Sequence, residues 1–435
     1  MANEEIILEK NKKKNIIVYF WYKAFSFDLL FYYATSFLFL NNYKGLSFAE
    51  ILFADSFFPF FKVFLQIPLT IFVEKHGKRI GLVIGSFALV IYMLLILGCN
   101  NMYILLVADF FMAIGFAFKN LCESNVLYDS LPNSDNKQKK FSKIDGRSSS
   151  FYYVFEAISC IISGILYVKN PNIPMVLSLV CTIIAFLLAH FFVDVPEDIS
   201  NNNEDHYSNR ATIKHYIRNL KNAFTFIFSS GRLKSLIYFN AFFMSLIYLT
   251  LSYRRSLLSE IGLSSQDIGI VFASLGIFSA ITAAISNKFN KILKNKTLSY
   301  FGIYYTVSIF LSGLVVELKL PFYIIVNAVT IMFGIQLAIK GPYQTLIRQY
   351  LSSFSTSSMR VKIMSASNIL EGLVTGIISL IGAWLLSFTD TANASIVIGI
   401  GSLSITIALI TYMQTRLGLK PEEYPRKDIE FKEVE

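Results

Sequence analysis

Charged residues are scarce in this chain. Lys, Arg, Asp and Glu together make up 16% of its 435 residues, whereas soluble globular proteins carry about 25%. Residues with hydrophobic side chains make up 54% of the chain. This composition argues against a soluble domain and is typical of a protein that crosses a membrane several times.

The chain is also poor in residues that form metal centres and disulfide frameworks. Its four cysteines, Cys99, Cys122, Cys160 and Cys181, are scattered, and its four histidines form no His-x-x-x-His pair. The sequence has no Walker phosphate loop, no Gly-x-Ser-x-Gly elbow and no dinucleotide fingerprint. We therefore expect no metal, no cofactor and no enzymatic activity. The missing phosphate loop excludes ATP as an energy source within this chain.

Long apolar segments are what the sequence has in abundance. A helix that crosses the hydrocarbon core needs about 20 apolar residues, and segments of this length recur with short polar breaks. None alternates polar and apolar residues as outer-membrane strands do. We expect an all-α integral membrane protein with twelve spans. These cover residues 16–40, 48–73, 80–98, 103–129, 148–168, 174–193, 235–253, 266–287, 298–316, 321–341, 363–388 and 393–414.

The distribution of basic residues predicts the orientation. With the N-terminus inside, most of the 39 Lys and Arg residues fall in the inner segments. The expected outer loops contain Lys44, Lys169, Arg254, Arg255 and Lys319. By the positive-inside rule both termini are cytoplasmic, in the plasma membrane or the inner membrane of the cell. Nucleic acid is not an expected partner, because the basic residues form no single patch.

Single basic residues near the span ends have simpler expected roles. Arg254 and Arg255 end the seventh span and are expected to anchor it at the outer interface. Lys23 is expected to reach the inner lipid headgroups, as long basic side chains do.

The spans fall into two groups of six. We expect an N-terminal tail at 1–15, a bundle at 16–193, a cytoplasmic linker at 194–234, a second bundle at 235–414 and a C-terminal tail at 415–435. Within the linker, "IKHYIRNLKNAFTFIFSS" places apolar residues at helical spacing among Lys and Arg. This pattern predicts an amphipathic helix at the inner membrane surface.

A charged turn joins the second and third spans. In "IPLTIFVEKHGKRIGL", Glu74 and Lys75 precede Gly77, and Lys78 and Arg79 follow it. A short connection between two helices needs a glycine where φ is positive. This stretch resembles the signature of the major facilitator superfamily between spans 2 and 3, although Thr70 stands where that family has its first glycine.

A second stretch extends the resemblance. "GFAFKNLCESNVLYDSL" and "FSKIDGRSSS" are similar to spans 4 and 5 of a poorly characterised bacterial branch of the superfamily. The family's drug/proton antiporters carry an arginine in the outer half of span 4 and a Gly-Pro pair in span 5. This chain has Asp109 at the position of that arginine, and its fifth span contains no proline.

The resemblance implies a fold and a set of gates. The fold is twelve helices in two pseudo-symmetric six-helix halves that alternate access to a central site, in a protein that works as a monomer. The residues of the Gly77 loop, Glu74, Lys75, Gly77, Lys78 and Arg79, would form a cytoplasmic gating loop. Asp129 and Arg147 would form a second gating cluster. The alternative is that these charges are ordinary positive-inside anchors.

Charges inside the spans need an explanation, because each costs at least about 2.5–3.5 kcal/mol at the bilayer centre. The charges expected to face a proton-coupling and substrate cavity are Asp28, Asp109, Lys119, Glu123, Glu156, Lys340 and Glu371. Lys119 and Glu123 are four residues apart and can pair. For Asp55 and Lys62, the favoured interpretation is a structural role. The alternative for every one of these charges is a structural pair between helices.

The sequence therefore predicts a secondary active transporter. Burial favours the protonated form of a carboxyl group, so we expect protons to drive transport of a small molecule across the lipid bilayer. The favoured substrate is an amphipathic or drug-like compound, moved outward. The alternatives are a proton-coupled importer of a sugar, peptide or organic ion, a flippase for a lipid or lipid-linked sugar, and a membrane sensor that transports nothing.

Overall fold

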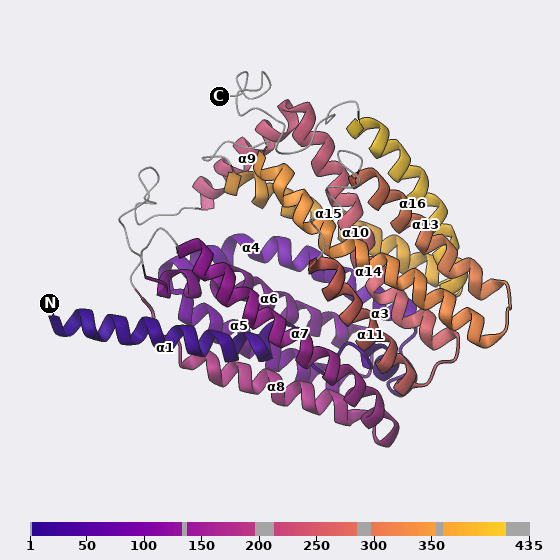
Figure 1. Cartoon of the computed structure of the whole chain (residues 1–435), viewed down its shortest axis with the longest axis horizontal. Helices are drawn as coiled ribbons and strands as arrows, with labels where there is room; N and C mark the ends of the chain where they lie inside the picture. Colours follow the sequence, from indigo (N-terminus) through magenta and orange to yellow (C-terminus); the bar gives the residue numbers. More distant parts are fainter. Residues whose placement is uncertain (1, 133–136, 196–212, 285–296, 354–359, 415–435) are drawn as a thin grey trace. The chain divides into compact units, whose positions relative to one another are not determined.

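The computed structural model describes residues 2–132, 137–195, 213–284, 297–353 and 360–414, and every regular element in these ranges is a helix (Figure 1). The elements are α1 (Ala2–Ser26), α2 (Ser36–Leu38), the π-helix η1 (Phe39–Tyr43), α3 (Phe48–Asp55), α4 (Phe57–His76), α5 (Lys78–Leu97), α6 (Met102–Ser130), α7 (Lys137–Lys169), α8 (Asn172–His190), α9 (Ile213–Ser229), α10 (Gly231–Glu260), α11 (Ser265–Ala284), α13 (Thr297–Glu317), α14 (Phe322–Ser353), α15 (Arg360–Leu386) and α16 (Thr391–Gln414).

Two compact units divide the chain. The N-terminal unit comprises Met1–Leu46 and Phe61–His215, and the C-terminal unit comprises Ser47–Phe60 and Tyr216–Glu435. The segment Ser47–Phe60 thus packs with the C-terminal unit, whereas the sequence places it in the first bundle. The reason is the packing of α3, where Leu52 is fully buried against a cluster of apolar residues from α10 and α15.

Ten of the described helices are long and apolar enough to cross a membrane. They correspond to ten of the twelve expected spans, and Ser265–Phe278 is a shorter apolar helix at the place of the eighth. The first expected span is not one helix. α1 ends at Ser26, and residues 27–35 form turns before α2 begins. A continuous helix over 16–40 was therefore a wrong prediction.

Small residues allow close packing of helices in the N-terminal unit. α5 lies against α6 and α8, and α1 packs on α6, α7 and α8. A Cβ atom at Gly85 of α5 would lie 2.7 Å from the Cβ atom of Phe118 on α6. Two tyrosines of α1, Tyr19 and Tyr22, are buried in the core that these helices share. The close approach fits membrane helices, whose association depends on van der Waals packing.

The C-terminal unit is built in the same way. α13 packs along α14 and α16, and α10 packs on α15 and α16. Its core holds Phe239 and Phe243 of α10 beside Tyr343 of α14, with the rings of Phe243 and Tyr343 4.3 Å apart. The amphipathic helix that the sequence predicts in the linker is present as α9.

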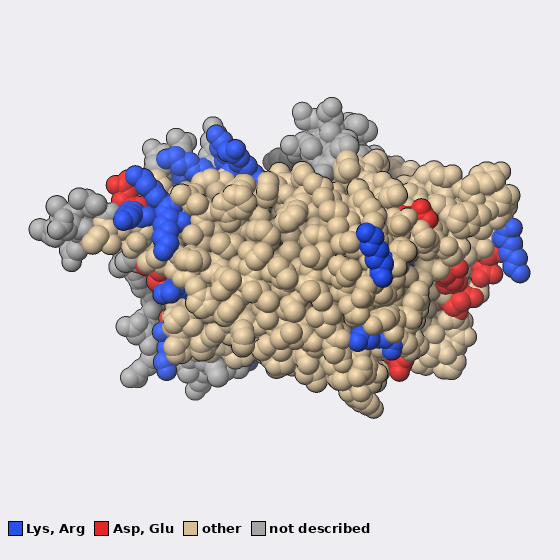
Figure 2. Space-filling model, turned by 90° about the horizontal axis from the view of Figure 1, so that it is seen from below, with Lys and Arg blue, Asp and Glu red and all other residues tan. Residues whose placement is uncertain are grey.

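Large apolar side chains also cover the outside of the molecule. Phe64, Trp384 and Phe388 are each more than 60% exposed. On the face drawn in Figure 2, charged residues are sparse and uncharged side chains cover most of the area. Such a surface is unfavourable in water and suits contact with lipid tails.

Candidate functional site

The break between α1 and α2 is the centre of the candidate site in the N-terminal unit. Residues 27–35 are not helical, and Phe31 has a φ of 62°. Leu29 and Leu30 are nevertheless buried, so carbonyl groups that a helix would pair lie inside the unit. Unwound backbone inside a membrane protein needs other partners for these groups.

A buried lysine supplies two of these partners. The ammonium group of Lys119 on α6 donates hydrogen bonds to the carbonyl oxygens of Ser26 and Phe27. It also lies 3.6 Å from a carboxylate oxygen of Glu123, and both side chains are only 8% exposed. Lys119 is thus a tethered cation at the carboxyl end of α1, where the helix dipole favours positive charge.

Asp28 lies in the break itself and is half-buried. One of its carboxylate oxygens accepts hydrogen bonds from the backbone N–H of Leu29, at 2.9 Å, and from the hydroxyl of Tyr33, at 2.5 Å. Both donors belong to the break. The carboxylate therefore holds the turns of this segment together.

The other side of the break is formed by α7. The hydroxyl of Ser163 lies 2.8 Å from the Phe31 carbonyl oxygen and 2.8 Å from the Thr35 hydroxyl. Tyr152 is 1% exposed, and its hydroxyl has no hydrogen-bond partner in the described part of the chain. Glu156 lies one turn further along α7 and is half-buried. The sequence analysis placed Glu156 at the cavity, but it did not predict the contact of this helix with a broken span.

Aromatic rings surround the acid of the break. The ring of Phe27 lies 4.8 Å from that of Tyr152 and 5.5 Å from that of Tyr153, and Phe25 packs against Phe155. The ammonium of Lys119 lies 5.2 Å from the centre of the Phe27 ring. The arrangement offers flat apolar faces and hydroxyl groups beside one carboxylate.

Asp109, also expected at this cavity, lies elsewhere on α6. It is buried, with 2% of its surface exposed. Fourteen residues separate it from Glu123, which is about 21 Å along a helix. Asp109 and Glu123 therefore do not form one cluster.

Two expected cavity charges, Lys340 and Glu371, belong to the C-terminal unit. Both are half-buried, Lys340 on α14 and Glu371 on α15. The side-chain amide of Asn240 donates to Glu371 at 3.3 Å, and the hydroxyl of Tyr343 donates to Asn240 at 3.1 Å. These contacts form a buried polar chain that links α10, α14 and α15.

The Gly77 loop forms a small network at one end of the N-terminal unit. Gly77 has a φ of 91°, which supplies the tight turn that the sequence predicts. The ammonium of Lys78 lies 2.6 Å from a carboxylate oxygen of Asp129. The backbone N–H of Arg79 donates to Asp194 at 3.1 Å. Two further loop residues, Glu74 and Lys75, are exposed at the end of α4.

The second gating cluster is divided in the structure. Asp129 pairs with Lys78 and thus joins the network of the Gly77 loop. Arg147 is exposed on α7. The residue of this segment that makes a buried contact is its neighbour Asp145, which the sequence analysis did not single out.

Lys23 does not reach the lipid headgroups, so that prediction was wrong. It is 5% exposed and forms an ion pair with Asp145 of α7. The hydroxyl of Tyr19 donates to the same carboxylate at 2.5 Å. The prediction failed because Lys23 and Asp145 are far apart in the sequence, and only the packing of α1 on α7 brings them together.

Arg254 is likewise not an interface anchor. It is 3% exposed inside the C-terminal unit, where one of its terminal nitrogens donates to the side-chain oxygen of Gln336 at 3.1 Å. The prediction failed because α10 continues to Glu260, beyond the end of the apolar run that marks the seventh span.

Many apolar helices, with ionisable groups held inside each unit and around a broken span, define a polytopic membrane protein with the features of a transporter. The family model of the Major Facilitator Superfamily matches residues 22–377. The chain belongs to this superfamily. It is a multi-pass membrane transport protein and not an enzyme.

Relatives and solved structures agree with this assignment. The chain is 23% identical over 330 residues to the "Uncharacterized MFS-type transporter YxaM" of Bacillus subtilis (strain 168), which covers 73% of this chain and 77% of that protein. The crystal structure of nucleoside transporter NupG is 10% identical, with a TM-score of 0.70 over 93% of this chain and 99% of that one. A D-xylose-proton symporter is 11% identical, with a TM-score of 0.66 over 93% and 98%. At these identities the solved structures show the fold alone.

Proposed function

We propose that this chain is a proton-coupled secondary transporter that exports a small amphipathic molecule, with Asp28 as the group that carries the proton. The observation behind the proposal is the position of Asp28. It is the acid of the broken span, and its carboxylate accepts hydrogen bonds from two donors of that same segment. The proposal takes transport by alternating access from the family to which the chain belongs.

Protonation of Asp28 would change the hydrogen bonds that residues 27–35 can form. A carboxylate only accepts hydrogen bonds, whereas a protonated carboxyl group also donates one. The hydroxyl of Tyr33 and the N–H of Leu29 both depend on the same accepting oxygen. Proton binding would weaken this pair of contacts and favour another arrangement of residues 27–35. A segment with two arrangements is what couples a bound proton to a conformational change.

Lys119 would keep its place through this change. Its contacts with the carbonyl groups of Ser26 and Phe27 and with Glu123 fix the carboxyl end of α1. In the proposal Glu123 remains the partner of Lys119, and Asp28 carries the proton. Asp109 and Glu156, with Lys340 and Glu371 of the other unit, are proposed as further polar groups of the transport route.

The rings around Asp28 favour an amphipathic substrate. The faces of Phe27, Tyr152 and Tyr153 suit an apolar or aromatic group, and the carboxylate suits a positive charge. The network of the Gly77 loop, with Lys78 and Asp129 at its centre, is proposed as the cytoplasmic gate.

The test uses the full chain in proteoliposomes that contain a pH-sensitive dye. A panel of compounds is added outside without an imposed gradient, and it comprises a nucleoside, a pentose, a dipeptide and a cationic aromatic dye. An antiporter would exchange the compound for a luminal proton and make the lumen alkaline. A symporter would carry the proton inward and make the lumen acidic. We expect alkalinisation with the cationic dye, and acidification with any other compound would favour the importer.

The matched variants are Asp28→Asn and Glu50→Gln. We expect D28N to abolish the pH change while substrate exchange continues, because the site remains but no longer exchanges a proton. Glu50 is an exposed acid in the capping box at the start of α3, and E50Q should behave like the unchanged chain. A normal pH change in D28N would exclude Asp28 as the proton carrier.

A further inference from the structure

The C-terminal unit contains a buried cationic cluster of its own. Arg254 of α10 is 3% exposed. One terminal nitrogen of its guanidinium donates to Gln336, and the hydroxyl of Tyr305 lies within hydrogen-bonding reach of the group. Tyr305 in turn lies 2.6 Å from the hydroxyl of Thr250. Gln336, Tyr305 and Thr250 are all uncharged side chains.

The positive charge of Arg254 is not balanced within the described part of the chain. No carboxylate forms an ion pair with it there, and its Nε–H group has no hydrogen-bond acceptor. The next residue, Arg255, is a second positive charge, and it lies near the carboxylate of Asp55. An arginine keeps its proton in proteins, and a buried charge is expensive without a counter-charge. The missing element is therefore an anion.

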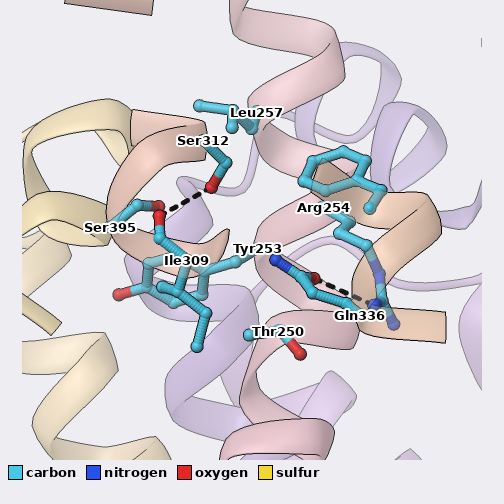
Figure 3. A pocket seen from close by; sticks show the side chains of 9 residues that line it. Thr250, Tyr253, Arg254, Leu257, Ile309, Ser312, Gln336 and Ser395 are labelled. Carbon is cyan, nitrogen blue, oxygen red and sulfur yellow. Dashed lines mark hydrogen bonds between the residues drawn. The ribbon is translucent and has the colours of Figure 1, made fainter. Parts of the chain in front are cut away.

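A small cavity opens beside this guanidinium. It has about 10 Å³ of free space, which is room for about one water-sized particle. Figure 3 shows the side chains of Arg254 and Gln336 directed toward one another on one side, and those of Ser312 and Ser395 on the other. Tyr253, Leu257, Ile309 and Phe333 also line the cavity.

The lining suits a single-atom anion better than a larger one. The space is too small for a phosphate group or an organic acid. Hydroxyl groups of Thr250, Ser312 and Ser395 lie on the wall, where each donates to a backbone carbonyl group of its own helix. The free Nε–H of Arg254 is a charged donor, and charge-assisted hydrogen bonds are the stronger kind.

We propose that this cavity binds one chloride-sized monovalent anion, which neutralises Arg254 and ties α10 to α13, α14 and α16. The four helices all contribute to the wall through Arg254, Ser312, Gln336 and Ser395. The anion is a free halide and separate from the transported molecule, because the cavity has no room for a substrate.

The test is the thermal unfolding of the purified full chain in chloride and in gluconate at equal ionic strength. We expect chloride to raise the unfolding temperature by at least about 2 °C, in a saturable way, because a ligand that binds only the folded state stabilises it. Bromide should replace chloride, and gluconate is too large to enter. Equal unfolding temperatures in chloride and gluconate would overturn the proposal.

Two variants and one control identify the site. Gln336→Glu places a carboxylate beside Arg254, so the protein should no longer respond to chloride and should be stable without it. Arg254→Gln removes the charge and should also lose the response. Lys319→Gln removes an exposed cation after α13 and should respond as the unchanged chain does. A chloride response that survives in both Q336E and R254Q would show a general salt effect and refute the site.

Discussion

The ammonium group of Lys119 donates to two backbone carbonyl groups and also pairs with Glu123, and a single substitution removes both interactions. In Lys119→Met, the carbonyl oxygens of Ser26 and Phe27 lose their donor and Glu123 becomes a buried charge without its partner. Removing one member of a buried pair costs about 3–5 kcal/mol. We therefore expect K119M to lower the stability of the purified protein by about this amount, measured by thermal or denaturant unfolding in detergent.

The double variant Lys119→Met, Glu123→Gln separates the two roles. It removes the unpaired charge but still leaves two backbone carbonyl groups without their donor. We expect it to recover part of the lost stability and not all of it. Full recovery would show that the lysine matters only for Glu123, and a K119M protein as stable as the unchanged chain would contradict the role given to Lys119 altogether.

Among single residues, pairs that are close in the sequence could be predicted, and pairs that are far apart in the sequence could not. The pairing of Lys119 with Glu123 follows from their spacing of four on a helix, and the structure confirms it. The carbonyl partners of Lys119 depend on the end of α1, which no residue pattern marks. Lys23 with Asp145, and Arg254 with Gln336, lie more than 80 residues apart, so only the packing of helices reveals them.

Helix contacts in the C-terminal unit depend on single glycines. On α16, Gly399 is buried, and a Cβ atom there would lie 2.5 Å from the Cα atom of Phe310 on α13. Two residues further along, Gly401 is exposed and has nothing within 4 Å of the same position. The two glycines share a helix and differ only in what faces them.

Alanine at these two positions should therefore have opposite effects. Gly399→Ala forces α13 and α16 apart and should cost about 1–3 kcal/mol, the usual cost of overpacking. Gly401→Ala should leave stability unchanged or raise it by up to about 1 kcal/mol, because alanine is the better helix former. Thermal unfolding of both variants in the same detergent measures the difference. A G399A protein as stable as G401A would show that this contact is loose.

Hydropathy predicts most elements of this chain but fails at the first span. The ten long helices each contain a run of apolar residues that is long enough to cross a bilayer, and such a run has few other stable structures in lipid. The stretch "FDLLFYYATS" contains one charged residue, Asp28, and has neither proline nor glycine, so no helix-breaking residue indicates the break. The break is stabilised by side chains of α6 and α7, which are distant in sequence.

For the molecule as a whole, the distribution of basic residues predicts the orientation in the membrane. The excess of Lys and Arg in alternate loops predicts that both termini are cytoplasmic. The loop that contains Lys75 then faces the cytoplasm, and the turn that contains Lys319 between α13 and α14 faces outward. Both lysines are exposed, and the four native cysteines are all buried. The chain therefore offers a low background for thiol labelling at either place.

Two single-cysteine additions, Lys75→Cys and Lys319→Cys, test this orientation. In intact cells, a membrane-impermeant maleimide should label K319C and leave K75C unlabelled, since only the outer turn is accessible. After lysis both variants should react, which shows that K75C is reactive and was merely shielded by the membrane. Labelling of K75C alone in intact cells would reverse the orientation. It would also place the Lys78–Asp129 network on the outer side, where it could not serve as a cytoplasmic gate.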